Sequence, residues 1–174
     1  MGKTYGFIYN EHNGDNLFRY EGKRLIGQFI GSDFREGCDC NYYFERRYGI
    51  SGKAGKHHWR GRGYVFFTHQ KICHLVVMRN SDNKPSLSNI EEALIELRDI
   101  MIKRGFKQVV LPRIEGVEWQ KVHDLIFKVF GGTTLDVLVV YNQEEYLFEM
   151  PPDTELLNWK HGDAMNGETE RKYY

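Results

Sequence analysis

The clearest pattern of hydrophobic and polar positions predicts a strand, a short loop and a helix in succession. Residues 108–111 form an apolar run of strand length, and Pro112 ends it. A loop with one glycine follows at residues 114–117. Apolar residues then recur at the spacing of one helix face, at Val122, Leu125, Ile126 and Val129. This order predicts half of a βαβ unit, and open α/β sheets bind ligands at the carboxyl end of such a strand.

Two further helices are predicted from periodicity and end signals. The longer covers residues 86–103, where Ser88 and Glu91 have the spacing of a capping box and Gly105 follows the last turn. Its apolar positions are Ile90, Leu94, Leu97 and Met101. The shorter helix covers residues 38–48 and ends at Gly49.

The remaining apolar runs predict strands. A hairpin is predicted from residues 64–68 and 72–78, and the nearly continuous apolar run 135–141 is typical of a strand covered on both faces. Shorter strands are predicted at residues 5–9, 17–20, 25–30 and, as an edge strand, 146–150. Strands separated by helices predict a three-layer α/β/α domain with a mixed central sheet.

Length and composition indicate one domain at residues 1–142 and an extension at residues 143–174, which would be an edge strand and then a flexible tail. The chain carries 24 basic and 24 acidic residues, so no global field favours nucleic acid or a membrane. No signal peptide, myristoylation pattern or membrane-length apolar run is found, and three cysteines do not make a disulfide framework. A cytoplasmic monomer is expected, in the host cytoplasm if the protein is viral.

Several short motifs, in order, resemble the macro-domain family. Lys84-Pro85 precedes the long predicted helix, residues 111–114 read Leu-Pro-Arg-Ile, Glu118-Trp119 opens the next helix, and the last core strand ends at Tyr141. The branch they resemble most contains the terminal ADP-ribose glycohydrolase and the ADP-ribose 1″-phosphate phosphatases. Upstream, Gly14-Asp15 matches the family's Gly-Asp turn, and residues 30–37 and 44–49 resemble its glycine loop and basic helix end.

The resemblance covers residues 14–141 and implies a macro-domain-like fold that binds ADP-ribose or a related NAD-derived nucleotide. Backbone amides of two loops, residues 31–41 and 115–118, would hold the diphosphate. Tyr141 would offer a stacking face, Asp33 would meet a ribose hydroxyl, and Asp15 would accept from the adenine amine. The expected ligand-binding residues are Asp15, Ile30, Asp33, Gly37, Cys38, Arg113, Ile114, Glu115, Gly116 and Tyr141.

Some of these residues also have purely structural interpretations. Asp15 lies in Asn-Gly-Asp-Asn, a sequence that suits a turn, and Tyr141 could simply cap the core. Arg113 is interpreted as a pairing residue that locks loops together. Asp39 and Glu115 place carboxylates where phosphates would approach, so they either repel the ligand, point away or do chemistry.

Three departures from the family pattern concern catalysis and the cradle for the diphosphate. Only Glu115, Gly116 and Val117 stand where the branch has Gly-Cys-Gly-Leu-Asp, so its catalytic Asp has no counterpart. Met78-Arg79 replaces the nucleophilic Lys of the glycohydrolase, and residues 37–40, Gly-Cys-Asp-Cys, replace a run of small residues. Any hydrolysis would need another acid, for which Asp33, Asp39 and Glu115 are the candidates.

Two other features suggest binding functions. Cys38 and Cys40, with His57 and His58, invite a zinc interpretation, but no second cysteine pair supports it, and no metal or cofactor is predicted. The basic loop 53–62 contains Trp59 and suits either phosphate and base binding or a solvated surface.

Three functions therefore compete. The favoured one is a module that binds an ADP-ribose-like nucleotide or an ADP-ribosylated macromolecule, in keeping with a viral or mobile-element protein. The alternatives are a hydrolase that removes ADP-ribose or its 1″-phosphate, and a nucleic-acid or protein binding module that uses the basic loop.

Overall fold

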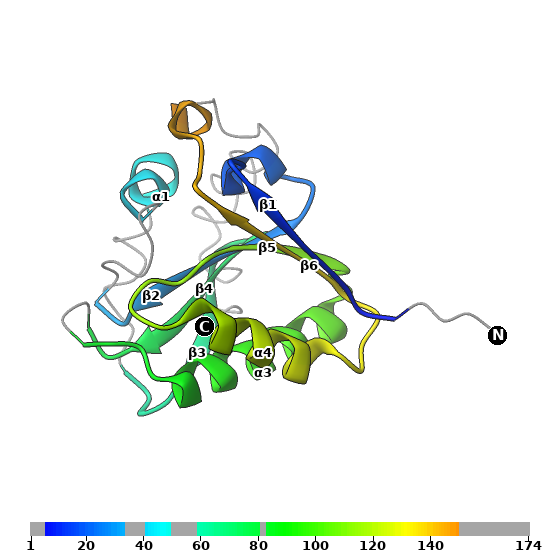
Figure 1. Ribbon diagram of the computed structural model, residues 1–174. Coiled ribbons are helices and arrows are strands. Elements are labelled where there is room, and N and C mark those ends of the chain that lie inside the picture. The colour runs from blue at the N-terminus through cyan, green and yellow to red at the C-terminus, as the bar shows by residue number, and fades with distance from the viewer. Residues whose placement is uncertain (1–5, 34–40, 50–58, 81–82, 150–174) are drawn as a thin grey trace.

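The centre of the protein is one mixed β-sheet with the strand order β1-β6-β5-β2-β4-β3 (Figure 1). The computed structural model describes residues 6–33, 41–49, 59–80 and 83–149. The strands are β1 (Ile8–Asn13), β2 (Leu25–Gly31), β3 (Tyr64–His69), β4 (Ile72–Met78), β5 (Gln108–Pro112) and β6 (Asp136–Tyr141). All neighbours pair in parallel except β3 and β4, which form the predicted antiparallel hairpin.

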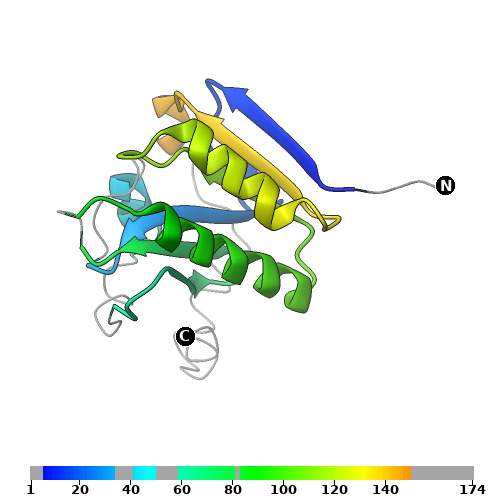
Figure 2. The same ribbon diagram turned by 60° about the horizontal axis from the view of Figure 1, so that its bottom comes forward.

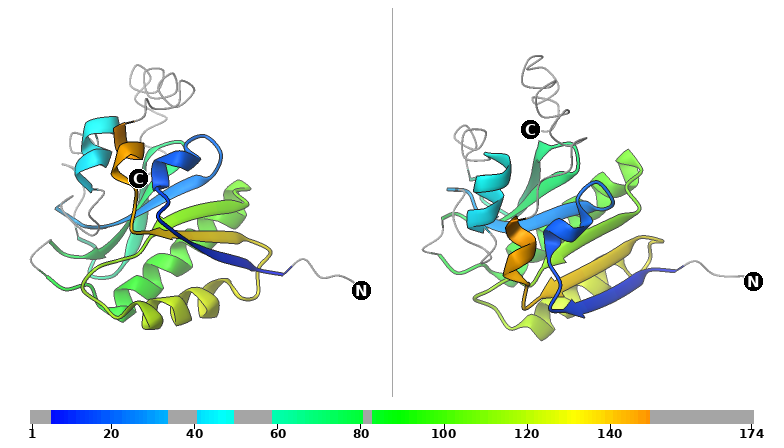
Figure 3. Two further views of the ribbon diagram at one scale, coloured as in Figure 1. Left: turned by 45° about the horizontal axis from the view of Figure 1, so that its top comes forward. Right: turned by 90° about the horizontal axis from the view of Figure 1, so that it is seen from above.

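Helices cover both faces of the sheet, which confirms the predicted three-layer α/β/α architecture. The helices α3 (Leu87–Arg104) and α4 (Trp119–Phe130) pack on one face (Figure 2). The other face carries α1 (Asn41–Tyr48) and two 3₁₀ helices, η1 (Leu17–Tyr20) and η2 (Glu145–Glu149) (Figure 3). Every residue of β2 and β4 is buried, as expected for strands that lie between two layers. No helix in the described ranges is long and apolar enough to cross a membrane.

The predicted strands at residues 17–20 and 146–150 are wrong: η1 and η2 stand there, although Met150 lies outside the described residues. Their apolar residues pack the outer layer onto the sheet, and Phe18 and Phe148 contact each other with ring centroids 5.6 Å apart. The side chain of Asn16 caps η1 by accepting from the amide of Phe18 at 2.8 Å. Segments of four or five residues are too short for apolar spacing to distinguish a 3₁₀ helix from a strand. The packing and capping that fix η1 and η2 are not visible in that spacing, so both segments were predicted as strands.

The first strand is also displaced from its predicted place. It pairs with β6 from Ile8↔Asp136 to Asn13↔Tyr141. It therefore extends into Asn13, the first residue of the Asn-Gly-Asp-Asn sequence that suits a turn. The last core strand, β6, is correctly predicted. Its regular parallel pairing with β1 overrides the local turn propensity of the residues in β1. Of the predicted helix 38–48, residues 38–40 lie outside the described residues.

The 3₁₀ helix η2 is fixed to the rest of the domain. Phe148 stacks on Tyr43 of α1, with ring centroids 4.1 Å apart. Arg47 donates to the backbone oxygen of Phe148 at 2.8 Å and forms a buried ion pair with Glu21. Tyr48 donates to the same Glu21 carboxylate at 2.5 Å. Residues 145–149 thus join α1 and η1 in one packed layer.

The N-terminal cap of α3 is Ser86, so the predicted capping box at Ser88 and Glu91 is wrong. The Ser86 hydroxyl accepts from the amide of Asn89 at 3.1 Å, and the helix begins at the next residue. Both serines precede a run of good helix formers, and the sequence alone favoured the later one because an acidic residue follows it at the right spacing. The predicted end is correct, since Gly105 is the C-cap with φ +79°.

The first prediction concerns η2. Phe148→Ala removes a ring that is only 6% exposed, so we expect a loss of about 3 kcal/mol in the free energy of unfolding. Tyr146→Ala, in the same 3₁₀ helix but 65% exposed, should change it by less than about 0.5 kcal/mol. Urea unfolding followed by circular dichroism measures both, and equal effects would show that η2 is not part of the core.

The second prediction concerns the cap of α3. Ser86→Ala should lower the free energy of unfolding by about 1 kcal/mol, because an amide of the first turn loses its acceptor. Ser88→Ala, inside the first turn, should be nearly neutral. The same urea titration compares the two variants, and a larger loss for Ser88→Ala would contradict the observed cap.

Candidate functional site

The candidate site lies at the carboxyl edge of the sheet, where the parallel strands β1, β6, β5, β2 and β4 all end. The neighbours β2 and β5 continue to opposite layers, since the next described element is α1 after β2 and α4 after β5. Open α/β sheets bind ligands where neighbouring connections diverge in this way. The β2–β5 junction is therefore the position to test for a ligand site.

The structure brings the described members of the predicted site to this edge. Asp15 follows β1, Asp33 follows β2, residues 113–116 follow β5, and Tyr141 ends β6. Ile30 and Ile114 also lie there, but their side chains are buried in the core, so only their backbone could face a ligand. Three expected residues, Gly37, Cys38 and Asp39, lie outside the described residues.

Arg113 is a pairing residue, as interpreted from the sequence. Its Nη2 donates to Glu11 Oε1 at 2.7 Å. Its guanidinium carbon lies 3.7 Å from the ring centroid of Tyr141 and 5.4 Å from that of Trp119. One face of the Tyr141 ring is therefore covered by Arg113, and a base could stack only on the other.

Glu11 is the acceptor that the sequence did not reveal. Besides Arg113, its carboxylate accepts from the Tyr9 hydroxyl at 2.6 Å and from Trp119 Nε1 at 3.3 Å. Burial alone would raise the pKa of Glu11, but these hydrogen bonds outweigh it and lower the pKa below its ordinary value. Burial, and then the Glu11 carboxylate, raise the pKa of Tyr9. The cluster ties β1 to the loop before α4 and to the start of that helix.

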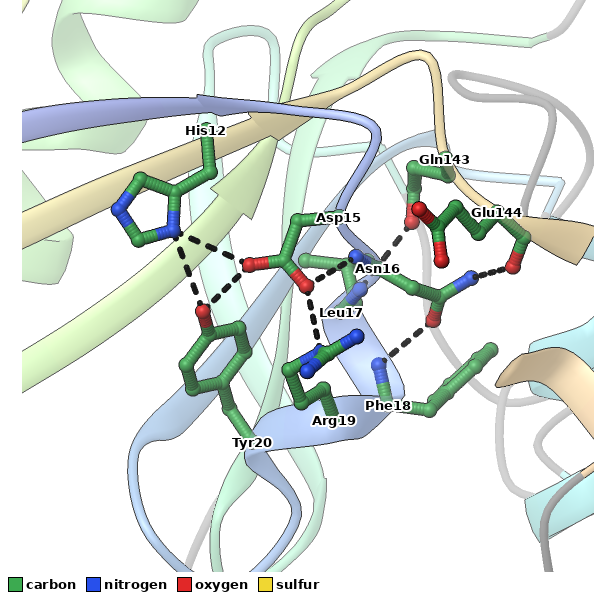
Figure 4. Close-up of polar contacts among 9 residues, drawn as sticks. All are labelled: His12, Asp15, Asn16, Leu17, Phe18, Arg19, Tyr20, Gln143 and Glu144. Carbon is green, nitrogen blue, oxygen red and sulfur yellow. Dashed lines mark hydrogen bonds and ion pairs between the residues drawn. The ribbon is translucent and has the colours of Figure 1, made fainter.

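Asp15 is surrounded by polar groups from the end of β1, from its own turn and from η1 (Figure 4). Asp15 Oδ1 accepts from the Asn16 amide at 2.8 Å and faces Arg19 Nε at 2.8 Å. Asp15 Oδ2 accepts from the Tyr20 hydroxyl at 2.5 Å and lies 3.1 Å from His12 Nδ1. Burial opposes ionisation, but these donors together lower the pKa of Asp15, while burial and Asp15 raise the pKa of Tyr20 to about 12. These contacts agree with the turn interpretation of Asp15.

Two glycines allow the loops at this edge to approach one another. A Cβ at Gly31 would lie 2.8 Å from Asp33 Oδ1 and 3.0 Å from the carbonyl carbon of Asn80, so the residues after β2 and β4 meet there. Gly116 has φ +87°, a conformation that glycine adopts without strain. It leads into α4, whose cap residue Glu118 makes no side-chain hydrogen bond to the helix amides. The Lys121 amide donates to the Glu118 backbone oxygen at 3.1 Å, and the cap side chain leaves the Trp119 and Gln120 amides to other acceptors.

Groups suited to covalent chemistry are few at the described part of this edge. The strand β4 ends at Met78, which is 6% exposed, followed by the exposed Arg79, and neither is a nucleophile. Cys73 lies at the start of β4, away from this edge, and burial raises the pKa of its thiol far above the ordinary value. Among described residues, no cluster of three or more His, Cys, Asp or Glu side chains suits a metal. The exposed carboxylates of Asp33 and Glu115 remain as the described acid–base candidates.

The basic loop is described only from Trp59 onward. Arg60 lies over the Tyr64 ring, 4.4 Å from its centroid. Arg60 and Arg62 each have a guanidinium nitrogen 3.9 Å from the Glu96 carboxylate. At these positions the positive charge is partly balanced within the protein, which weakens the case for phosphate binding there.

The Glu11 cluster predicts acid-sensitive stability. The pKa of Glu11 in the folded protein lies below its ordinary value of 4.5. The free energy of unfolding that this carboxylate contributes is therefore complete above pH 4.5 and is lost as the pH falls through the folded pKa. Glu11→Gln should cost about 1–3 kcal/mol at neutral pH and flatten the acid limb of the stability curve. Melting temperatures measured from about pH 7 to 3 test this.

The matched control is Glu118→Gln, because that exposed carboxylate makes no capping hydrogen bond. An equal flattening of the acid limb in this control would mean that general charge, and not the Glu11 cluster, governs acid stability.

Comparisons with known proteins agree on the fold. No protein-family model matches the chain. The ADP-ribose glycohydrolase OARD1 of Homo sapiens is 22% identical over 130 residues, which cover 71% of this chain and 86% of the human protein. The macrodomain of Thermus aquaticus DarG superposes with a TM-score of 0.60 at 16% identity, covering 78% of this chain and 99% of that one.

A second similar structure contains ADP-ribose. Thermosipho africanus DarTG in complex with ADP-ribose superposes with a TM-score of 0.57 at 16% identity, over 87% of this chain and 46% of that one. At such identities the likeness concerns architecture, and the sheet order and layers described above agree with it. The chain therefore has the macrodomain fold, as its resemblance to the macro-domain family predicts.

Proposed function

We propose that the chain binds ADP-ribose or a related NAD-derived nucleotide, free or attached to a macromolecule, at the carboxyl edge of its sheet. The observation that carries the proposal is the β2–β5 junction, because the next described elements, α1 after β2 and α4 after β5, lie in opposite layers and the cap side chain of α4 makes no hydrogen bond to the helix. The shared fold with a protein solved in complex with ADP-ribose supports the same ligand class.

The described residues suit the parts of such a nucleotide. Amides at the start of α4, reached through Gly116 at φ +87°, favour a diphosphate. The exposed Asp33 suits a ribose hydroxyl, and the face of Tyr141 that Arg113 leaves open suits a base. Ile30, Gly37, Cys38 and Ile114 complete the site that the family resemblance implies.

Two exposed carboxylates, Glu115 and Glu118, flank Gly116 on the same loop. A diphosphate held there meets negative charge as well as the amides, so its affinity depends on backbone donors and not on cationic side chains. Arg113, the basic residue of the loop, is already paired with Glu11. We expect moderate affinity that changes little with salt, unlike the steep salt dependence of basic phosphate sites.

Hydrolysis is the second candidate, because one similar protein is an ADP-ribose glycohydrolase. The chain has Met78-Arg79 and Glu115-Gly116-Val117 where the resemblance would place the nucleophilic Lys and the acidic Asp. Turnover would therefore need Asp33, Asp39 or Glu115 as a base for water. Release of ADP-ribose that disappears in Glu115→Gln would favour this candidate over binding alone.

The fourth prediction tests the proposed site by calorimetric titration with ADP-ribose. Tyr141→Ala should weaken binding about tenfold, the value of one base–aromatic stack. Tyr141→Phe keeps the ring and should bind as the wild type does. Phe127→Ala is the control, because this 43% exposed ring contacts Phe7, at the opposite edge of the sheet from Tyr141.

Wild-type protein that binds no ADP-ribose would refute the proposed function. Salt-dependent binding of RNA or DNA by the same sample would then favour the nucleic-acid alternative.

A further inference from the structure

The side chain of Tyr141 is held differently from its backbone. The backbone is fixed by the pairing of β6 with β1, and its carbonyl oxygen accepts from the Gly14 amide at 2.8 Å. Within the described ranges, the Tyr141 hydroxyl makes no hydrogen bond and the ring packs against neither apolar core cluster. The Arg113 guanidinium carbon, however, lies 3.7 Å from the ring centroid. Among the described residues, Arg113 is therefore the side chain that can orient this ring.

The guanidinium of Arg113 is held by one charged hydrogen bond and by aromatic rings. Its Nη2 donates to Glu11 Oε1 at 2.7 Å. Its Nε is buried and meets no acceptor among the described residues. A buried N–H without an acceptor costs free energy, so hydrogen bonding alone does not explain this orientation. The guanidinium instead lies within cation–π distance of the Tyr141 and Trp119 rings, at 3.7 and 5.4 Å from their centroids.

Glu11 is itself fixed by donors from two different elements. The Tyr9 hydroxyl, from the same strand β1, donates to its carboxylate at 2.6 Å. Trp119 Nε1, from the first turn of α4, donates at 3.3 Å. A carboxylate held by a strand and a helix is a rigid support, so Glu11 presents Arg113 to the Tyr141 ring in a defined position.

We propose that Arg113, presented by Glu11, is a positioning residue that orients the Tyr141 ring for stacking on the base of the nucleotide. This inference rests on the proposed function. It assigns recognition of the base to successive contacts from Glu11 to Arg113, from Arg113 to Tyr141 and from Tyr141 to the base. A ring that is already oriented loses little conformational freedom when a base stacks on it, so its preorganisation adds affinity. Arg113 thus acts on the base through Tyr141 and not on the phosphates.

Lysine is not equivalent to arginine in this role. Arg113→Lys keeps the positive charge and can still pair with Glu11, but it replaces a planar group that stacks on a ring by a flexible point charge. A contact of residue 113 with a phosphate would largely survive this change. Orientation of the Tyr141 ring would not.

The test is a double-mutant cycle on the full chain, measured by calorimetric titration with ADP-ribose. Arg113→Lys should weaken binding about fivefold, which is less than the loss expected for Tyr141→Ala. In the Tyr141→Ala background the same change should have no further effect, because no ring remains to be oriented.

Unchanged binding in Arg113→Lys, or a loss of the same factor in both backgrounds, would overturn this inference alone. An equal loss would mean that Arg113 acts on the ligand directly or only through the general structure of the loop. Wild-type protein that binds no ADP-ribose would overturn the proposed function, and this inference with it.

The matched control is Arg104→Lys. The Arg104 guanidinium carbon lies 4.7 Å from the Phe67 ring centroid, at the end of α3 and just before β5 begins, so this pair is at the opposite edge of the sheet from the site. The control should bind ADP-ribose as the wild type does. A loss equal to that of Arg113→Lys would contradict the assignment.

Glu11→Gln tests the preceding contact by a second route. It removes the charge that holds Arg113, so binding should weaken about threefold in the wild-type background and stay unchanged in the Tyr141→Ala background. Each titration is made well below the melting temperature of the variant, measured by circular dichroism, so lost stability alone does not lower the affinity. An undiminished effect in the Tyr141→Ala background would contradict the role of Glu11.

Discussion

Parallel alignment of five neighbouring strands is the constraint on which the rest of this structure depends. Parallel strands cannot be joined by tight turns, so each connection must cross a face of the sheet and cover it. All carboxyl ends then meet at one edge, together with the polar residues that follow each strand. The same geometry that buries β2 and β4 on both faces thus creates the candidate site.

Polar groups gathered at one edge must either find partners or remain available to a ligand. In this chain much of that polar capacity is used internally. Glu11 binds Tyr9, Arg113 and Trp119, and Asp15 binds Tyr20 and Arg19 of η1. Carboxylates that are already paired hold loops in place, but they cannot accept a hydrogen bond from a ligand without first losing an existing bond. Among the described residues, the edge still offers the exposed carboxylates of Asp33 and Glu115, backbone at the start of α4, and one face of Tyr141.

Long periodic segments were predictable from the sequence, and short ones were not. The helix α3 and the succession β5, loop and α4 are long enough for apolar spacing to specify them. The 3₁₀ helices η1 and η2 are too short for that. Phe18 and Phe148 contact each other in the folded protein, and this contact leaves no spacing pattern in the sequence. Within the site, the pairing role of Arg113 could be inferred from its place after a strand. Its partner Glu11 could not, because 102 residues separate them.

The residues after β6 contact two separate parts of the outer layer. Gln143 and Glu144 hold the Asp15 turn, and Phe148 holds α1 through Tyr43 and Arg47. The described part of the predicted extension, residues 143–149, therefore contacts both the Asp15 turn and α1. A change in it would alter the Asp15 turn and the layer of α1 together, because the same seven residues, 143–149, contact both. The candidate site is thus coupled to a part of the chain that the family resemblance does not cover, since that resemblance ends at Tyr141.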